Sequence, residues 1–119
     1  MAKIKPTGPI PSGYEGKDGE LSIGGEKASH LVSKNGSPLF VYSRERLSQQ
    51  IAGLRHAMPD DLHIHYAMKA NPFAPLLSHM TSVVDGIDIA SGGELRMALG
   101  AGAEPASISF AGPGKRDEE

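Results

Sequence analysis

The stretch HYAMKANP, residues 65–72, places a lysine at the end of a short run of strand-forming residues, directly before an Asn-Pro turn. If residues 62–69 form a strand, alternate side chains point to opposite faces, so Lys69 lies on one face and a row of apolar residues on the other. The apolar side chains are Leu62, Ile64, Tyr66 and Met68, and those that share the face of Lys69 are His63, His65 and Ala67. Most lysines are solvated surface residues, because buried charges are rare. The interpretation of Lys69 therefore depends on the segments that follow it.

Two later segments show the same alternation. In residues 86–90, two isoleucines lie opposite Asp88, and in residues 107–111 an isoleucine and a phenylalanine lie opposite serine and alanine. Helical patterns separate these strands, which predicts parallel βα units. In a closed βα barrel the apolar faces meet the outer helices, so Lys69 and Asp88 would point inward from neighbouring strands. Lys69 would then lie at the carboxyl end of its strand, the rim where such barrels carry their chemistry.

The rest of the chain also divides into elements. An irregular arm is expected over residues 1–19, which are rich in glycine and proline. We expect further strands at residues 20–23 and 39–42, and helices at residues 28–34, 43–58 and 92–100. A further helix is expected to end near Val83 and to begin either after Asn71, with Pro72 in its first turn, or nearer Ala74. Ser91 and Glu94 have the spacing of a capping box, which favours a structural role for both over a catalytic one.

A resemblance to a known family rests on these motifs. The run YAMKAN, residues 66–71, resembles the cofactor-lysine motif of the fold-type III pyridoxal-phosphate decarboxylases, which act on diaminopimelate, ornithine and arginine. The runs GIDIASGGEL, residues 86–95, and FAGPGK, residues 110–115, resemble the ends of the next two strands in that family. The resemblance extends from about Pro38 to the C-terminus. The opening and closing residues further resemble the branch associated with the exosortase A system.

The resemblance implies a fold and a domain organisation. Residues 38–119 would be the first βα units of a (β/α)8 TIM barrel of the alanine racemase-like type. Residues 1–37 would form an N-terminal arm with a short strand and helix, which in the family joins a C-terminal β domain. The strand at residues 20–23 would therefore have no partner in this chain. A complete barrel takes about 250 residues, whereas the chain has 119. We therefore expect an N-terminal piece of a longer protein, inactive on its own.

The resemblance also implies a site. Lys69 would form a Schiff base with pyridoxal 5'-phosphate, Asp88 would stabilise the proton there, and Ala67 would leave room for the cofactor ring. Asp88 could instead be a buried acid paired for structure only, and Ala67 could be ordinary barrel packing. His63 and His65 have no third ligand nearby, so a hydrogen-bonded barrel interior is favoured over a metal site.

The implied reaction is the decarboxylation of an amino acid of the diaminopimelate or ornithine type, with carbon dioxide released from the α-carbon. An amino-acid racemase or a non-catalytic barrel that binds the cofactor remains an alternative. The family resemblance further implies a homodimer.

Composition sets broader limits on function. The formal net charge is −2 and there is no cysteine. A near-neutral chain argues against nucleic-acid binding, which usually needs a basic face. No apolar run approaches the length needed to span a bilayer, so a cytoplasmic protein without membrane contact is expected.

Overall fold

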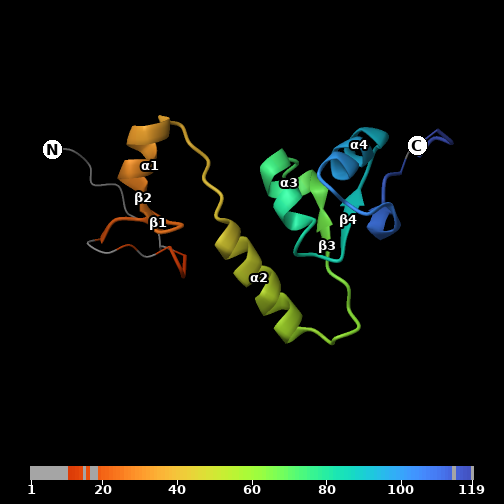
Figure 1. The fold of residues 1–119 in the computed structure, drawn as a ribbon, viewed down its shortest axis with the longest axis horizontal. Coiled ribbons are helices and arrows are strands. Elements are labelled where there is room, and N and C mark those ends of the chain that lie inside the picture. The colour runs from red at the N-terminus through yellow and green to blue at the C-terminus, as the bar shows by residue number, and fades with distance from the viewer. Residues whose placement is uncertain (1–10, 15, 17–18, 114, 119) are drawn as a thin grey trace. The chain divides into compact units, whose positions relative to one another are not determined.

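The structure is a computed structural model that describes residues 11–14, 16, 19–113 and 115–118. The chain divides into two compact units, Met1–Ser43 and Arg44–Glu119 (Figure 1). The irregular arm expected over residues 1–19 lies largely outside the described residues. The expected domain boundary between residues 37 and 38 stays a prediction.

The first unit contains a small hairpin followed by a helix. Strands β1 (Ser22–Ile23) and β2 (Glu26–Lys27) pair antiparallel. Gly24 and Gly25, both with positive φ, make the turn between them, a conformation that glycine adopts without steric cost. The expectation that residues 20–23 have no partner was therefore wrong, because the local turn supplies one.

Helix α1 (Ala28–Asn35) begins directly after the hairpin. The carboxylate of Glu20 accepts a hydrogen bond from the Ser29 amide at 2.8 Å. That hydrogen bond at the start of the helix lowers the pKa of Glu20 below its ordinary value. The helix ends at Gly36, whose φ of 84° lies in the left-handed region.

The strand predicted over residues 39–42 is not formed, so this prediction was wrong. Residues 39–43 belong to no helix or strand, and Phe40 is 85% exposed. A strand exists through hydrogen bonds to a neighbouring strand. No described strand pairs with this segment, so its β-forming side chains alone do not produce one.

The second unit contains a parallel sheet with intervening helices. The strands are β3 (His65–Ala67), β4 (Gly86–Ile89) and β5 (Ile108–Phe110), in the order β3-β4-β5. Helix α2 (Arg44–Ala57) precedes the sheet, and helices α3 (Ala74–Met80) and α4 (Gly92–Gly100) connect its strands. Short 3₁₀ turns follow β3, at Met68–Ala70, and precede β5, at Pro105–Ser107. The predicted βα units are therefore present.

The core lies on one face of this sheet. It is built from Met68, Leu77, Ile87, Ile89, Ala98 and Ala103, all buried. Leu77 comes from α3 and Ala98 from α4, so both helices cover the same face of the sheet (Figure 1). The sheet thus has a covered apolar face and a second, more polar face, as the alternation predicted.

Polar contacts link α2 to the rest of its unit. Ser48 Oγ lies 3.0 Å from His79 Nε2 of α3, and Arg55 forms an ion pair with Asp85, just before β4. The apolar stripe of α2 is only half-buried, and no residue of this helix is fully buried.

Helix α3 begins at Ala74. Just before it, Asn71 Oδ1 accepts a hydrogen bond from the Phe73 amide at 3.0 Å.

Candidate active site

Lys69 lies just beyond the carboxyl end of β3. The strand ends at Ala67, and Lys69 is the middle residue of the following 3₁₀ turn, not the last residue of a strand over residues 62–69 as predicted. Its side chain is exposed. Met68 beside it is fully buried in the core, which anchors the turn. Among the residues that the structure describes, none forms a hydrogen bond or ion pair with the Lys69 amine, so this amine is available to a ligand.

Asp88 lies on the polar face of the sheet, in the middle of β4. It is in register with Ala67 of β3 and Ser109 of β5, and in-register side chains of neighbouring strands share a face. The half-buried Asp88 carboxylate accepts a hydrogen bond from Ser109 Oγ at 3.0 Å. The sheet therefore brings Asp88 and Ala67 together on its polar face. Lys69 follows at the edge of the sheet where the strands have their carboxyl ends.

A histidine extends this polar arrangement across the sheet. His65 Nδ1 of β3 lies 3.1 Å from Ser109 Oγ of β5. Residues from three neighbouring strands thus form one hydrogen-bonded string. The sequence placed His65 and Ser109 on the inward face but gave them no part in the site. The sequence signal that could have linked them to Asp88 is the alternation along the strands, which places all three side chains on the same face.

Gly86 makes room for the histidine ring. A Cβ atom at Gly86 would come within 2.5 Å of His65 Cε1 and 2.7 Å of Nε2, and within 2.2 Å of the Ser107 carbonyl oxygen. Because real Cβ atoms do not approach other atoms so closely, only glycine allows the ring to lie across β4 here. The reach of His65 to Ser109 therefore depends on a residue without a side chain.

Ser91 and Glu94 form the predicted cap of α4. Ser91 Oγ accepts a hydrogen bond from the Glu94 amide at 3.2 Å. The Glu94 carboxylate accepts one from the amide of Ala90, at 2.6 Å, one residue before the position typical of a capping box. Both side chains are committed to the start of the helix, which confirms their structural role.

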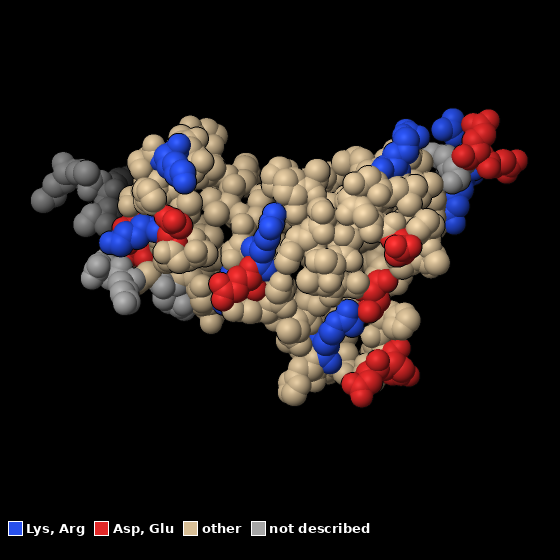
Figure 2. Space-filling view, viewed as in Figure 1, with Lys and Arg blue, Asp and Glu red and all other residues tan. Residues whose placement is uncertain are grey.

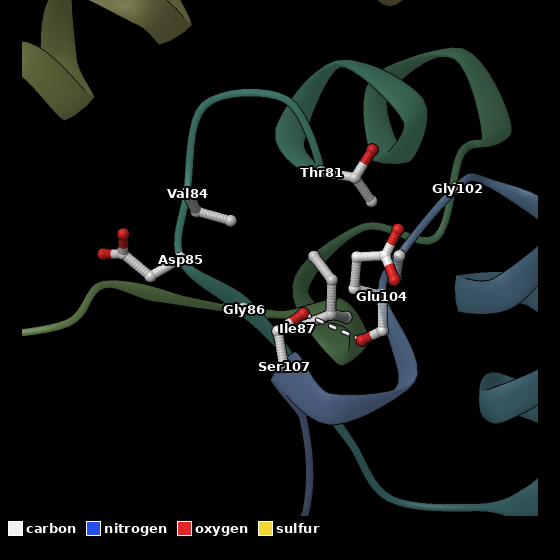
Figure 3. A pocket seen from close by; sticks show the side chains of 9 residues that line it. Thr81, Val84, Asp85, Gly86, Ile87, Gly102, Glu104 and Ser107 are labelled. Atoms are coloured by element: carbon white, nitrogen blue, oxygen red, sulfur yellow. Dashed lines mark hydrogen bonds between the residues drawn. The ribbon is translucent and has the colours of Figure 1, made fainter.

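A cavity of about 240 Å³ lies at the other edge of the sheet. Figure 3 shows the residues around it, among them Gly86 and Ile87 at the amino end of β4 and Ser107 just before β5. The hydroxyl of Ser107 donates to the Glu104 carbonyl oxygen at 2.9 Å. In parallel βα barrels the carboxyl edge carries the chemistry and the amino edge contributes stability. The edge of the sheet that leads to Lys69 is therefore a better candidate for the site than this cavity.

Surface charge and metal ligands add little to the site. On the face shown in Figure 2, basic and acidic side chains are interspersed and neither sign forms a continuous patch. Within the described ranges, no group of three or more His, Asp or Glu side chains could hold a metal ion. None of the helices in the described part of the chain has the length and hydropathy that crossing a bilayer requires.

Residues 44–119 match the family described as "Pyridoxal-dependent decarboxylase, pyridoxal binding domain". This match covers more than half of the chain, so the chain belongs to the pyridoxal-dependent decarboxylase family. The predicted fold class is confirmed as well: the chain is α/β and forms an N-terminal part of the barrel. Its assignment to the exosortase-associated branch stays a prediction.

Several relatives carry a more specific name. The diaminopimelate decarboxylase of Aquifex aeolicus is 42% identical over 105 residues, and that of Vibrio cholerae is 36% identical over 104 residues. These alignments cover 88% and 87% of this chain but 25% of each relative. The chain therefore spans about a quarter of the length of these relatives.

Solved structures show the same likeness. A crystal structure of an Aquifex aeolicus protein superimposes with a TM-score of 0.79 at 41% identity, covering 88% of this chain and 26% of that one. The diaminopimelate decarboxylase of M. jannaschi gives a TM-score of 0.71 at 30% identity, covering 87% and 26%. Both structures support the arrangement of the elements described above.

The residues at the carboxyl edge fit the family's cofactor, pyridoxal phosphate. Its aldehyde requires an amine that is not engaged elsewhere, and the exposed Lys69 amine meets this condition. Ala67 adds only a methyl group to the polar face. Asp88 supplies a carboxylate from the next strand.

Proposed function

We propose that the whole protein is a pyridoxal-phosphate-dependent decarboxylase of amino acids and that Lys69 binds the cofactor through a Schiff base. The observation that carries the proposal is the position of Lys69. Its amine is exposed and uncommitted, just past the carboxyl end of a strand in a chain that belongs to the pyridoxal-dependent decarboxylase family. The relatives named diaminopimelate decarboxylase support diaminopimelate as the first substrate to test.

The residues of this chain would divide the work at the site. When bound, pyridoxal phosphate supplies a ring that accepts the electron pair left as carbon dioxide departs from the α-carbon. Lys69 would hold the cofactor through its amine, and this amine would be free to carry a proton once substrate takes its place. Asp88 favours a positive charge on a nearby nitrogen, because opposite charges stabilise each other in a partly dry site. Ala67 leaves space beside the ring.

The proposed oligomeric state, location and substrate class follow from the same family. We propose a homodimer in the cytoplasm that acts on a free amino acid, with residues outside this chain holding the phosphate and the substrate side chain. Because the chain spans about a quarter of its relatives, the 119 residues alone are expected to release no carbon dioxide.

Borohydride reduction of the whole protein tests the cofactor assignment. Reduction should fix the cofactor covalently, and peptide mass spectrometry should place the added mass on Lys69. The matched control is Lys34, near the exposed end of α1, which should stay unmodified. An unmodified Lys69 in protein that carries the cofactor would contradict the proposal.

Substrate assays test the reaction. Carboxyl-labelled diaminopimelate, ornithine and arginine should be compared for release of labelled carbon dioxide. Release from diaminopimelate above the other two is the expected result. Inversion at the α-carbon without release would identify a racemase. A Lys69-linked cofactor with neither reaction would identify a non-catalytic binding protein.

A further inference from the structure

We propose that Ser109 and His65 are positioning residues for Asp88, joined to it in a hydrogen-bonded string across the polar face of the sheet. The string links β3, β4 and β5 through two contacts, Ser109 Oγ to Asp88 Oδ1 at 3.0 Å and His65 Nδ1 to Ser109 Oγ at 3.1 Å. This inference rests on the proposed function, because it names the residues that hold the Asp88 carboxylate, which is proposed to act beside the cofactor.

Counting protons gives the string a direction. A serine hydroxyl has one hydrogen to donate, and an ionised carboxylate has none. The hydroxyl hydrogen of Ser109 therefore goes to Asp88, and Ser109 must accept from its other neighbour. His65 then donates from Nδ1, so the Nδ1–H form of the ring is the one the string selects.

The string fixes one oxygen of Asp88 and leaves the other available. Oδ1 accepts from Ser109, whereas no described residue hydrogen-bonds to Oδ2. A carboxylate rotates about its terminal bond unless a partner holds it. Ser109 therefore holds the plane of the carboxylate, and Oδ2 is left to receive the positive charge that Lys69 or the bound cofactor brings to this face.

Gly86 explains how a residue of β3 can support a residue of β5. A Cβ at this position would overlap the His65 ring, so the ring passes over the backbone of β4 through the space that the glycine leaves. The string is therefore built into the strands themselves and does not rely on a loop.

The test uses the whole protein loaded with cofactor and a matched pair of serines. Ser109→Ala removes the hydroxyl that contacts Asp88. Ser107→Ala removes a hydroxyl only two residues away, whose partner is the Glu104 carbonyl oxygen at the other edge of the sheet. Because hydrogen bonds to charged groups contribute more than neutral ones, Ser109→Ala should lower kcat by roughly 10- to 100-fold while KM changes little. Ser107→Ala should match wild type, and Ser109→Thr, which keeps the hydroxyl, should recover most of the rate.

Variants of His65 test the second contact. Asparagine places its amide nitrogen near the position of Nδ1, whereas leucine has no donor. His65→Asn should retain more of kcat than His65→Leu. Two readouts separate positioning from a general loss of structure: the visible absorption band of the bound cofactor, and the rate at which Lys69 is acylated in cofactor-free protein. The absorption band and the acylation rate should both shift in Ser109→Ala and His65→Leu. The thermal unfolding midpoint should be unchanged in Ser109→Thr and Ser107→Ala.

The outcomes separate the two proposals. If borohydride fixes the cofactor on Lys69 but Ser109→Ala and His65→Leu behave like Ser107→Ala in rate, spectrum and acylation, the positioning role is wrong and the proposed function stands. If wild-type protein fixes no cofactor on Lys69, the proposed function fails and this inference fails with it.

Discussion

The carboxylate of Asp85 accepts hydrogen bonds from both terminal nitrogens of Arg55, at 2.9 and 3.0 Å. Arg55 belongs to α2, and Asp85 directly precedes β4. The same carboxylate accepts from the Ile64 amide at 2.7 Å, and the Asp85 amide donates to the Ile64 carbonyl oxygen at 2.9 Å. A single acidic residue thus joins the last turn of a helix to the starts of two neighbouring strands.

This arrangement predicts a pH dependence of stability. The hydrogen bonds from Arg55, and next that from Ile64, lower the pKa of Asp85 from 3.8 to about 2. A carboxyl group with a lowered pKa stabilises the fold above the pKa of its unfolded state, and the stabilisation is lost as pH falls toward the folded value. The difference in unfolding free energy between wild type and Asp85→Asn should therefore be constant above about pH 5 and shrink between pH 4 and 2. Urea unfolding at a series of pH values measures it; a difference that does not change with pH would contradict the assignment.

If Lys69 binds the cofactor as proposed, replacing it should cause a loss of function without a loss of fold. Lys69→Ala should abolish borohydride fixation and lower kcat by roughly 100-fold or more, since both attachment and proton transfer depend on the amine. The amine has no described partner, so the unfolding midpoint of cofactor-free protein should stay close to wild type. A large drop in that midpoint would show that the amine has a structural role.

Gly86 predicts a steric effect at the start of the central strand, β4. Gly86→Ala would bring a Cβ within 2.2 Å of the Ser107 carbonyl oxygen and 2.5 Å of the His65 ring. Overpacking of this kind costs about 1–3 kcal/mol. Gly100→Ala is the control, because nothing lies within 4 Å of a Cβ there. Thermal unfolding should show a lower midpoint for the first variant only, and equal midpoints would refute the close approach.

The buried leucine of α3 predicts a cavity effect. Leu77 is 1% exposed and belongs to the core cluster. Leu77→Ala should reduce the free energy of unfolding by about 2–5 kcal/mol, whereas Leu77→Met keeps the volume and should cost less than about 1.5 kcal/mol. Denaturant unfolding of both variants gives the comparison. A similar cost for both would mean that volume is not what Leu77 contributes.

The cap of α4 predicts a smaller effect. Ser91→Ala removes the acceptor for the Glu94 amide and should cost about 1 kcal/mol, whereas Ser91→Asn restores an acceptor and should cost little. Circular dichroism during urea unfolding measures both. An Asn variant as unstable as the Ala variant would indicate that capping is not the cause.

The sequence predicted the faces of the sheet better than the lengths of its strands. Ile87, Ile89 and Met68 alternate with polar or small residues, and burial against α3 and α4 follows directly from that alternation. Lys69 was placed on a strand because β-forming residues precede it. The chain instead leaves the strand after Ala67 and forms a 3₁₀ turn over Met68–Ala70, although the side chain of Met68 enters the core as its place in the alternation predicted.

Features that depend on distant partners were harder to predict. The side chains of residues 39–42 favour a strand, but no described segment supplies its hydrogen bonds. The contact of His65 with Ser109 spans 44 positions and passes over Gly86. Alternation places both residues on one face, but it does not show that the ring crosses a whole strand.

The alternation along β4 also restricts how this region can change in length. Ile87 and Ile89 face the helices, while Asp88 between them faces the other side. Inserting or deleting one residue within Gly86–Ile89 would exchange the two sets of side chains beyond that point. The acid would then enter the core and an isoleucine would take its place on the polar face, so the stability of the sheet and the proposed role of Asp88 would be lost in the same event.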